Sequence, residues 1–250
     1  EDRGVRLTTQ EDQCVFPVSQ DSESIILCLK REAQKNGAEI RTRHEVSRIE
    51  HLEDGTFRLS FASADIAPCC VDRVAITSGG APLPKDLLYL ETLGHETEAP
   101  VPSLYTFNIK NEAAHQLMGI VVEEATAWIP GTKFKSQGAL LFTHWGMSGP
   151  AILKLSSYAA RWIHENGYRF PLQVCWIEEN NTERVAEELK HIQNQHAQKQ
   201  LASIRPYLLP QRLWNHLIEK AGLTPDKKWG ETGKKSINRL VTLLTSDTYE

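Results

Sequence analysis

Residues 138–157, GALLFTHWGMSGPAILKLSS, place a histidine beside a glycine-rich turn and the expected start of a helix. The bulky apolar run up to His144 predicts a strand. Pro150 suits the first turn of a helix, because its missing N–H would be unpaired there anyway, and we expect Ser148 to cap that helix. A helix N-terminus carries free N–H groups and a partial positive charge, so it suits a phosphate, a carboxylate or an electron-rich ring edge. His144 could donate a hydrogen bond or a proton there.

Two glycines in this turn, Gly146 and Gly149, allow either a ligand or another backbone segment to approach closely. The stretch therefore predicts a functional site at the end of a strand. The alternative is an ordinary strand–turn–helix joint with His144 hydrogen-bonded inside a β domain.

The segment 190–239 is rich in lysine and arginine and contains Trp214 and Trp229. A small basic helical module of this kind can bind nucleic acid. The spread of the cations favours the alternative, a helical bundle whose lysines face solvent while both tryptophans pack inside. GETGKKS at 230–236 is not a phosphate loop, because only two residues separate its glycines. The chain has no GxGxxG motif, so it is not by itself a complete dinucleotide-binding domain.

Length and composition indicate a globular protein of two or more domains. The chain has 250 residues, 40% of them hydrophobic and 24% charged, and its net charge of −4 gives no overall nucleic-acid signal. No apolar run approaches the ~18 residues of a membrane span, and the first residues do not resemble a signal peptide. Five cysteines without a CxxC pair favour neither a zinc site nor a disulfide framework. We therefore expect a cytoplasmic protein with no membrane partner and no metal.

The elements that must position these residues follow from periodicity and turn signals. A helix is expected over 22–36, and a β-meander follows, with a hairpin at Asp54-Gly55 and a third strand over 71–80. Residues from about 100 to 177 are mainly strand-like, with a helix over 150–165. Residues from about 182 to 246 are helical. The predicted fold class is α+β, with several domains.

LLFTHWGMSGPAILKLSSY resembles the LFTHxGxSGPAIL signature of a family of bacterial FAD-binding proteins. These are the NAD(FAD)-utilising dehydrogenase or aminoacetone oxidase family flavoproteins (BaiN-like). VFPVSQDSESIILCL at 15–29 is similar to the family's VFPVSDKASxVVxAL, and residues 37–50 and 209–229 resemble further parts in the same order. The resemblance covers nearly the whole chain.

This resemblance implies the middle part of a larger two-dinucleotide-binding-domain flavoprotein. Residues 1–95 would be part of the FAD-binding domain, with a helix and an antiparallel β-meander. Residues 96–178 would be a β-barrel-like insert, and residues 179–250 a small helical insert. The family's N-terminal GxGxxG segment and its C-terminal return segment would lie outside this chain, so we expect the chain alone to be inactive.

The resemblance also implies a cofactor and site residues. FAD would carry the redox chemistry, with NAD(P)H as a candidate electron donor and a small molecule of unidentified kind as substrate; nucleic acid is not the expected partner. His144 and Ser148 would lie on the substrate side of the flavin, where the insert closes over it. The positions that would contact the cofactor are Val46, Gly79, Gly80 and Gly149.

Two departures from the family pattern keep a second function open. The family's ATGGxSxPxxGSTGDGY corresponds here to ITSGGAPLPKDLLYLETLGH, which lacks the second glycine cluster, and Cys14 stands where the family often has arginine. The alternative is a catalytically degenerate binding module whose basic helical insert contacts nucleic acid or another acidic partner.

Overall fold

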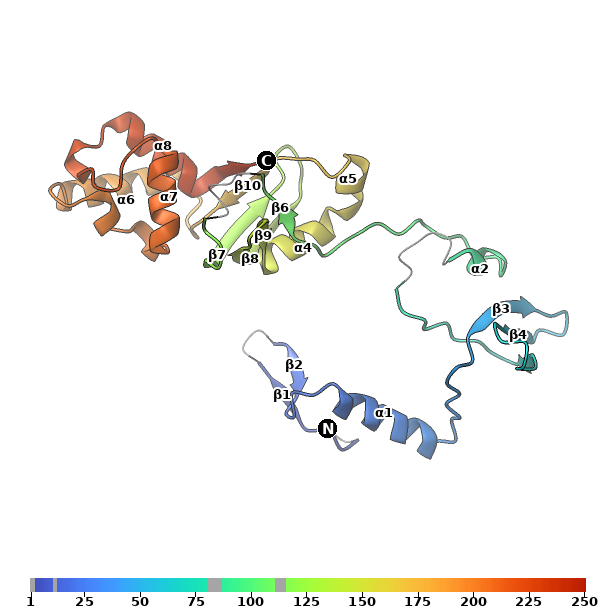
Figure 1. The fold of residues 1–250 in the computed structure, drawn as a ribbon. Helices are drawn as coiled ribbons and strands as arrows, with labels where there is room; N and C mark the ends of the chain where they lie inside the picture. Colours follow the sequence, from blue (N-terminus) through green and yellow to red (C-terminus); the bar gives the residue numbers. More distant parts are fainter. Residues whose placement is uncertain (1–2, 11–12, 81–86, 111–115) are drawn as a thin grey trace. The chain divides into compact units, whose positions relative to one another are not determined.

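In the computed structural model (Figure 1), the described residues are 3–10, 13–80, 87–110 and 116–250. The chain divides into two compact units, an N-terminal unit (Glu1–Glu98) and a C-terminal unit (Ala99–Glu250). Each unit has its own helices and sheets.

The N-terminal unit begins with a short hairpin and a helix. Strands β1 (Leu7–Thr9) and β2 (Val15–Pro17) pair antiparallel, and helix α1 (Glu23–Lys35) follows. The Asp21 carboxylate accepts a hydrogen bond from the first helical N–H at 2.9 Å, whereas the Ser22 side chain makes no capping bond. The predicted helix is confirmed, with Asp21 as the capping side chain.

Three antiparallel strands form the meander: β3 (Val46–His51), β4 (Phe57–Phe61) and β5 (Cys69–Val71). In the turn between β3 and β4, the Asp54 carboxylate accepts hydrogen bonds from the N–H and the hydroxyl two residues on, at 2.9 and 2.6 Å. Gly55 has φ +83°, a conformation that favours glycine. The predicted hairpin and meander are confirmed.

The third strand is shorter than predicted. It ends at Val71, and residues 73–80 have no regular structure, although the sequence predicted strand up to Gly80. No described strand pairs with this segment, and an unpaired strand leaves its backbone groups without partners. A single turn of helix, α2 (Leu88–Glu91), follows. Cys28 is the one buried apolar side chain among the described residues of this unit, so the unit has almost no core of its own.

The C-terminal unit is built on a curled antiparallel sheet, a half-barrel, with strand order β11-β10-β7-β8-β9-β6. Its strands are β6 (Phe107–Asn108), β7 (Val121–Trp128), β8 (Lys135–Phe142), β9 (Gly146–Ser148), β10 (Leu172–Cys175) and β11 (Asp247–Tyr249). This sheet confirms a mixed α/β protein with a barrel-like antiparallel part.

Helix α4 (Pro150–Tyr158) packs against β7, β8 and β9, and α5 (Ala160–Glu165) follows it. The sequence predicted one continuous helix here, but the structure breaks it at Ala159, which has φ −97° and ψ 5°. Ile152 before the break and Ile163 after it are both fully buried. The break therefore lets both segments turn an apolar face to the core.

Three helices form the remainder of the C-terminal unit: α6 (Thr182–Gln195), α7 (Gln211–Lys220) and α8 (Lys234–Ser246). They confirm the predicted helical region. Trp214 and Trp229 are fully buried and stacked, with ring centroids 6.1 Å apart. No helix in the described part of the chain is long and apolar enough to cross a membrane. The short 3-10 turns between these helices are η2 (Leu201–Ser203), η3 (Pro206–Leu208) and η4 (Trp229–Glu231).

Strand β11 connects the helices back to the sheet. It follows α8 directly and pairs with β10, with Leu172 opposite Tyr249 and Val174 opposite Asp247. The sheet and the three helices consequently share one hydrophobic core. A strand of three residues has no periodicity to detect, which is why the sequence did not predict it.

Candidate functional site

The histidine-bearing stretch forms a β-hairpin followed by a helix. Strand β8 ends at Phe142, β9 pairs back along it, and α4 starts at Pro150. The hairpin turn is closed by Thr143, whose N–H donates to the Gly146 carbonyl at 2.8 Å and whose hydroxyl accepts from the Gly146 N–H at 3.1 Å. The predicted strand and helix start are confirmed, but the segment between them contains strand β9 rather than a turn alone.

His144 and Trp145 lie in the turn of this hairpin. Both side chains are exposed, Trp145 to 50%, and their ring centroids are 3.8 Å apart. His144 is therefore not enclosed in the β domain, which excludes the alternative of a buried structural histidine. An exposed indole next to an imidazole can stack on a planar ligand and hydrogen-bond to it.

Both glycines of this stretch are required by the packing of backbone segments. A Cβ at Gly146 would lie 2.0 Å from the carbonyl oxygen of Phe107, and a Cβ at Gly149 would lie 2.6 Å from that of Ala139. Gly149 also has φ +92°. Close approach of another backbone segment, one of the two explanations open from sequence, therefore accounts for both residues. A cofactor contact at Gly149 stays a prediction.

Ser148 is half-buried in β9, and its hydroxyl accepts a hydrogen bond from the Thr106 hydroxyl at 3.2 Å. The N-cap residue of α4 is Gly149, and no side chain caps this helix. The predicted capping role of Ser148 is wrong, because its strand pairing turns the side chain toward Thr106. Its expected place on the substrate side stays a prediction.

Three of the four residues expected to contact the cofactor, Val46, Gly79 and Gly80, lie in the N-terminal unit. Val46 opens β3 and is 44% exposed. Gly79 has φ +83°, and no described atom lies within 4 Å of the position a Cβ would take at Gly79 or Gly80. The backbone here is open to approach by another group, and nothing in the described chain packs against it.

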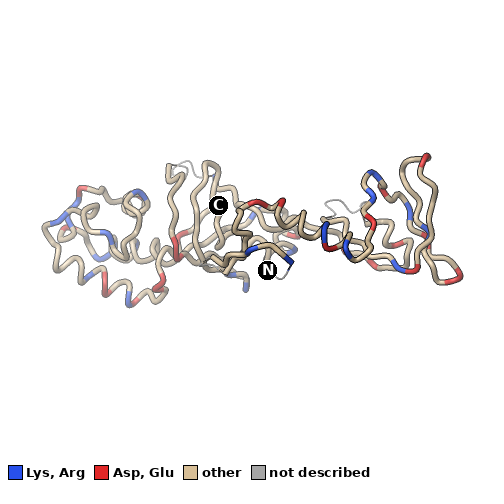
Figure 2. Tube along the Cα trace, turned by 90° about the horizontal axis from the view of Figure 1, so that it is seen from below, with Lys and Arg blue, Asp and Glu red and all other residues tan. Residues whose placement is uncertain are grey.

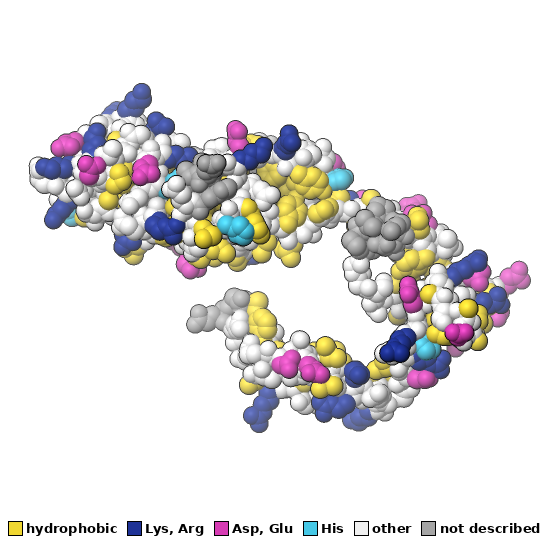
Figure 3. Space-filling model, in the orientation of Figure 1, with side chains coloured by type: hydrophobic (Ala, Val, Ile, Leu, Met, Phe, Trp, Pro, Cys, Tyr) yellow, Lys and Arg dark blue, Asp and Glu magenta, His cyan; other side chains and the backbone are white. Residues whose placement is uncertain are grey.

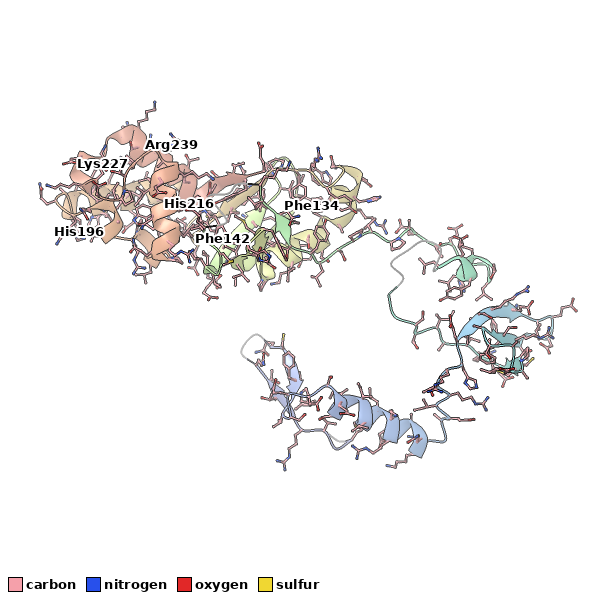
Figure 4. The ribbon with its side chains drawn as sticks, viewed as in Figure 1. Phe134, Phe142, His196, His216, Lys227 and Arg239 are labelled. Carbon is pink, nitrogen blue, oxygen red and sulfur yellow. The ribbon has the colours of Figure 1, made fainter. Side chains whose placement is uncertain are left out.

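A depression of about 480 Å³ lies beside α4 and α5, where apolar side chains gather in Figure 3. Phe134, labelled in Figure 4, and Trp162 line it, with ring centroids 6.4 Å apart. Tyr158 is 63% exposed, and the Arg161 guanidinium donates to the Ala99 carbonyl at 3.4 Å. The lining comes from three distant stretches of chain, so the sequence did not reveal this surface.

A fully buried carboxylate, Asp247, joins the last strand to α7. It accepts hydrogen bonds from the Trp176 indole N–H at 3.1 Å, the Tyr249 hydroxyl at 2.6 Å and the Lys220 ammonium at 2.5 Å. The Lys220 Nζ also lies 4.1 Å from the centroid of the Tyr249 ring. Burial, reinforced by the neighbouring carboxylate, raises the pKa of Tyr249 well above its usual value. This cluster fixes the helices to the sheet, and sequence reasoning missed it.

His216 lies on α7 beside this cluster (Figure 4). Its Nε2 atom is buried without a hydrogen-bond partner among the described residues. Burial, together with the Lys220 charge, lowers the pKa of His216 below its usual value. Burial in the folded protein therefore favours the neutral form of this imidazole. No group of His, Cys, Asp and Glu suited to a metal ion occurs in the described part of the chain.

Comparison with known protein families shows which family the chain belongs to. Residues 101–249 match a model described as the HI0933-like protein barrel and H2TH domain. The chain belongs to the HI0933-like family. The curled sheet and the helices α6 to α8 are consistent with the two parts of that description. The match also confirms, at the level of the family, the relationship to FAD-associated flavoproteins that the signature motif indicated.

The HI0933-like chain is also similar to a curated protein, the Ribosomal RNA dihydrouridine synthase of Haemophilus influenzae (strain ATCC 51907 / DSM 11121 / KW20 / Rd). The two are 28% identical over 232 residues, which cover 89% of this chain and 54% of that protein. The chain thus spans about half the length of the relative it matches.

Lysine and arginine residues, blue in Figure 2, occur along α6 to α8 and the loops between them in this HI0933-like chain. Lys220 is bound to Asp247, and the Arg212 guanidinium donates to the backbone carbonyls of Met118, at 3.3 Å, and of Gln116. Lys220 thus joins α7 to β11, and Arg212 joins α7 to the turn before β7. Others, including Lys228, are exposed.

Proposed function

We propose that this chain is the barrel-bearing middle region of a FAD-dependent oxidoreductase that reduces uridine bases in RNA. The similarity to the Ribosomal RNA dihydrouridine synthase carries the proposal. It covers 89% of this chain, so it includes part of the N-terminal unit as well as the C-terminal unit. Membership of the HI0933-like family supports a flavin as the redox group.

The exposure of three residues in the N-terminal unit supports the proposal that this unit contributes to a FAD site. Gly79 has φ +83° and open space around it, which fits a turn that a dinucleotide approaches closely. Gly80 is equally open, and Val46 is accessible at the start of β3. We propose that these three positions hold one side of FAD. The phosphate-binding GxGxxG loop would come from a segment that the longer relative's length leaves room for.

Reduction of uridine to dihydrouridine adds a hydride and a proton across the C5–C6 double bond. Bound FAD would supply the hydride, with NAD(P)H as the proposed electron donor. On the barrel, the half-exposed Trp145 ring offers a face on which uracil can stack. His144 beside it can hydrogen-bond to a uracil carbonyl oxygen or deliver the proton. We propose that both lie on the substrate side of the flavin, as does Ser148.

The second candidate is the catalytically degenerate module that binds nucleic acid through its helical segment. The exposed lysines of that segment favour it, as does the missing second glycine cluster after Gly80. It differs from the oxidoreductase in one property, because it would bind RNA without binding a flavin.

The test uses the full-length protein encoded by the gene. Its visible absorption spectrum is recorded with and without NAD(P)H, and ribosomal RNA from cells with and without the gene is digested and analysed by mass spectrometry. A flavin spectrum that NAD(P)H bleaches, together with a uridine that carries two extra hydrogens only when the gene is present, would support the proposal. A His144→Ala protein should keep the flavin and form less dihydrouridine. RNA binding by a colourless protein, with no change in ribosomal RNA, would instead establish the binding module.

A further inference from the structure

Two loops far apart in the sequence lie side by side at one end of the helical segment. Residues 197–202 follow α6, and residues 225–230 precede α8. Gln200 and Lys228 form an isolated antiparallel bridge. Four backbone hydrogen bonds join the loops: Leu201 N to Lys227 O at 2.8 Å, Trp229 N to Lys199 O at 3.0 Å, Gly230 N to Ala197 O at 2.9 Å and Ala202 N to Pro225 O at 3.0 Å.

This pair of loops is a fixed platform. A Cβ at Gly230 would lie 3.0 Å from the Ala197 carbonyl oxygen, so the two backbones touch. The Gln193 side chain of α6 donates to the Trp229 and Thr232 carbonyls at 3.0 and 2.6 Å, which anchors the turn before α8. Trp229 is fully buried beneath it.

The pairing of the two loops brings together lysines that are far apart in the sequence. We define the basic tip as five lysines from the two loops and the start of α8: Lys199, Lys227, Lys228, Lys234 and Lys235. Lys227, like the neighbouring His196, lies at the end of the helical segment away from the sheet in Figure 4. No lysine of the tip forms a salt bridge with any residue in the described part of the chain; Lys228 donates to the Gln198 amide oxygen at 3.2 Å. Asp226 is the carboxylate within these loops, and Glu231 directly follows the second loop.

We propose that the basic tip binds the phosphate backbone of the RNA that the barrel acts on. This inference rests on the proposed function. Four of the five lysines are exposed and Lys227 is half-buried. Lysines without carboxylate partners keep their charge for a ligand, and polyanionic RNA complements that charge. Trp214 and Trp229 are buried, so neither indole presents a face to bases, and the lysines of the tip would position the backbone without reading sequence. The tip would thus supply affinity for the RNA backbone, while the uracil base would be bound at Trp145 and His144.

The test compares two triple variants of the full-length protein. The first, Lys199→Gln/Lys228→Gln/Lys234→Gln, removes three exposed charges of the tip. The matched control removes three exposed charges from the barrel half of the C-terminal unit: Lys110→Gln, Lys133→Gln and Lys154→Gln. Binding of a labelled fragment of ribosomal RNA is measured by fluorescence anisotropy at several salt concentrations. Thermal unfolding and the flavin spectrum verify that each protein is folded.

The tip variant should bind RNA more weakly, and its plot of log affinity against log salt should be shallower by about 2, since each lost phosphate contact removes about 0.7 from the slope. The control should keep the slope of the unmodified protein. An unchanged slope in the tip variant, or an equal loss in the control, would overturn the basic tip as the contact surface. Failure of the unmodified protein to bind RNA at low salt would instead overturn the RNA substrate of the proposed function.

Discussion

Gly149→Ala tests whether the glycine before α4 is required by packing rather than by a ligand. The added methyl carbon would lie 2.6 Å from the Ala139 carbonyl oxygen, where carbon–oxygen contacts are ordinarily about 3.3–3.6 Å. That oxygen belongs to the backbone of β8, so it cannot rotate away as a side chain could. Strand β8 and the start of α4 must therefore separate by about 0.7 Å or more.

The cost has two parts. An L-residue at φ +92°, ψ 171° is strained by about 1–3 kcal/mol, since this region is populated almost only by glycine. Forcing a methyl group into filled space adds about 1–3 kcal/mol. We expect the free energy of unfolding to fall by about 4 kcal/mol, which corresponds to a melting temperature lower by roughly 8–16 °C for a unit of this size.

Urea unfolding of the 250-residue chain, followed by tryptophan fluorescence, measures this change. Gly131→Ala is the matched control, because Gly131 has φ +76° but no packing atom of a described residue within 4 Å of its Cβ position. It should lose only the strain, about 1–2 kcal/mol. If Gly149→Ala stayed within about 0.5 kcal/mol of the unmodified chain, the packing explanation would be wrong. Loss of flavin from an otherwise stable full-length Gly149→Ala protein would then show that the glycine serves the cofactor.

Three further predictions follow from the described contacts. Lys220→Met should lower the free energy of unfolding by about 3 kcal/mol in urea, because it leaves the Asp247 carboxylate buried without its cation; adding Asp247→Asn should restore part of the loss. Because the pKa of His216 is lower in the folded state, its contribution to stability is complete above the unfolded pKa of 6.5 and is lost as the pH falls through the folded pKa. Unfolding curves taken from pH 7 downward should show that loss, and His216→Gln should remove it. His144→Ala and Trp145→Ala should each change stability by less than about 0.5 kcal/mol, since both side chains are exposed, and a large fall in melting temperature for either would refute their placement in an exposed turn.

Local signals predicted the elements whose stability is local. Helix α1, the Asp54-Gly55 hairpin and helices α6 to α8 were all predicted, because capping residues, turn residues and helical periodicity lie within a few residues of the structure they specify. The signature motif also led to the correct family. Strands β9 and β11 were missed, since three-residue strands exist only by pairing with a neighbour. The length of β5 was overestimated, because the sequence does not show where its pairing with β4 ends.

For the candidate site too, the sequence identified the residues, and the structure was needed to find their contacts. Sequence singled out His144 and the glycines around it, and it left open whether the glycines serve a ligand or a backbone contact. The approach of Ala139 to Gly149 accounts for that glycine by packing, and a cofactor contact at the same position stays a prediction. Likewise, Ser148 had the right residue type and spacing for a cap, and its pairing within β9 directed the hydroxyl to Thr106 instead.

The sequence by itself determined the family, the principal helices and the residue types available for chemistry, because these depend on neighbours along the chain. Only the tertiary structure brought Asp247 to Trp176, 71 residues away, and Lys199 to the loop that contains Lys228. Burial and charge density are properties of how distant segments pack. They decided which cations hold the fold together, as Lys220 does, and which are exposed, as Lys228 is.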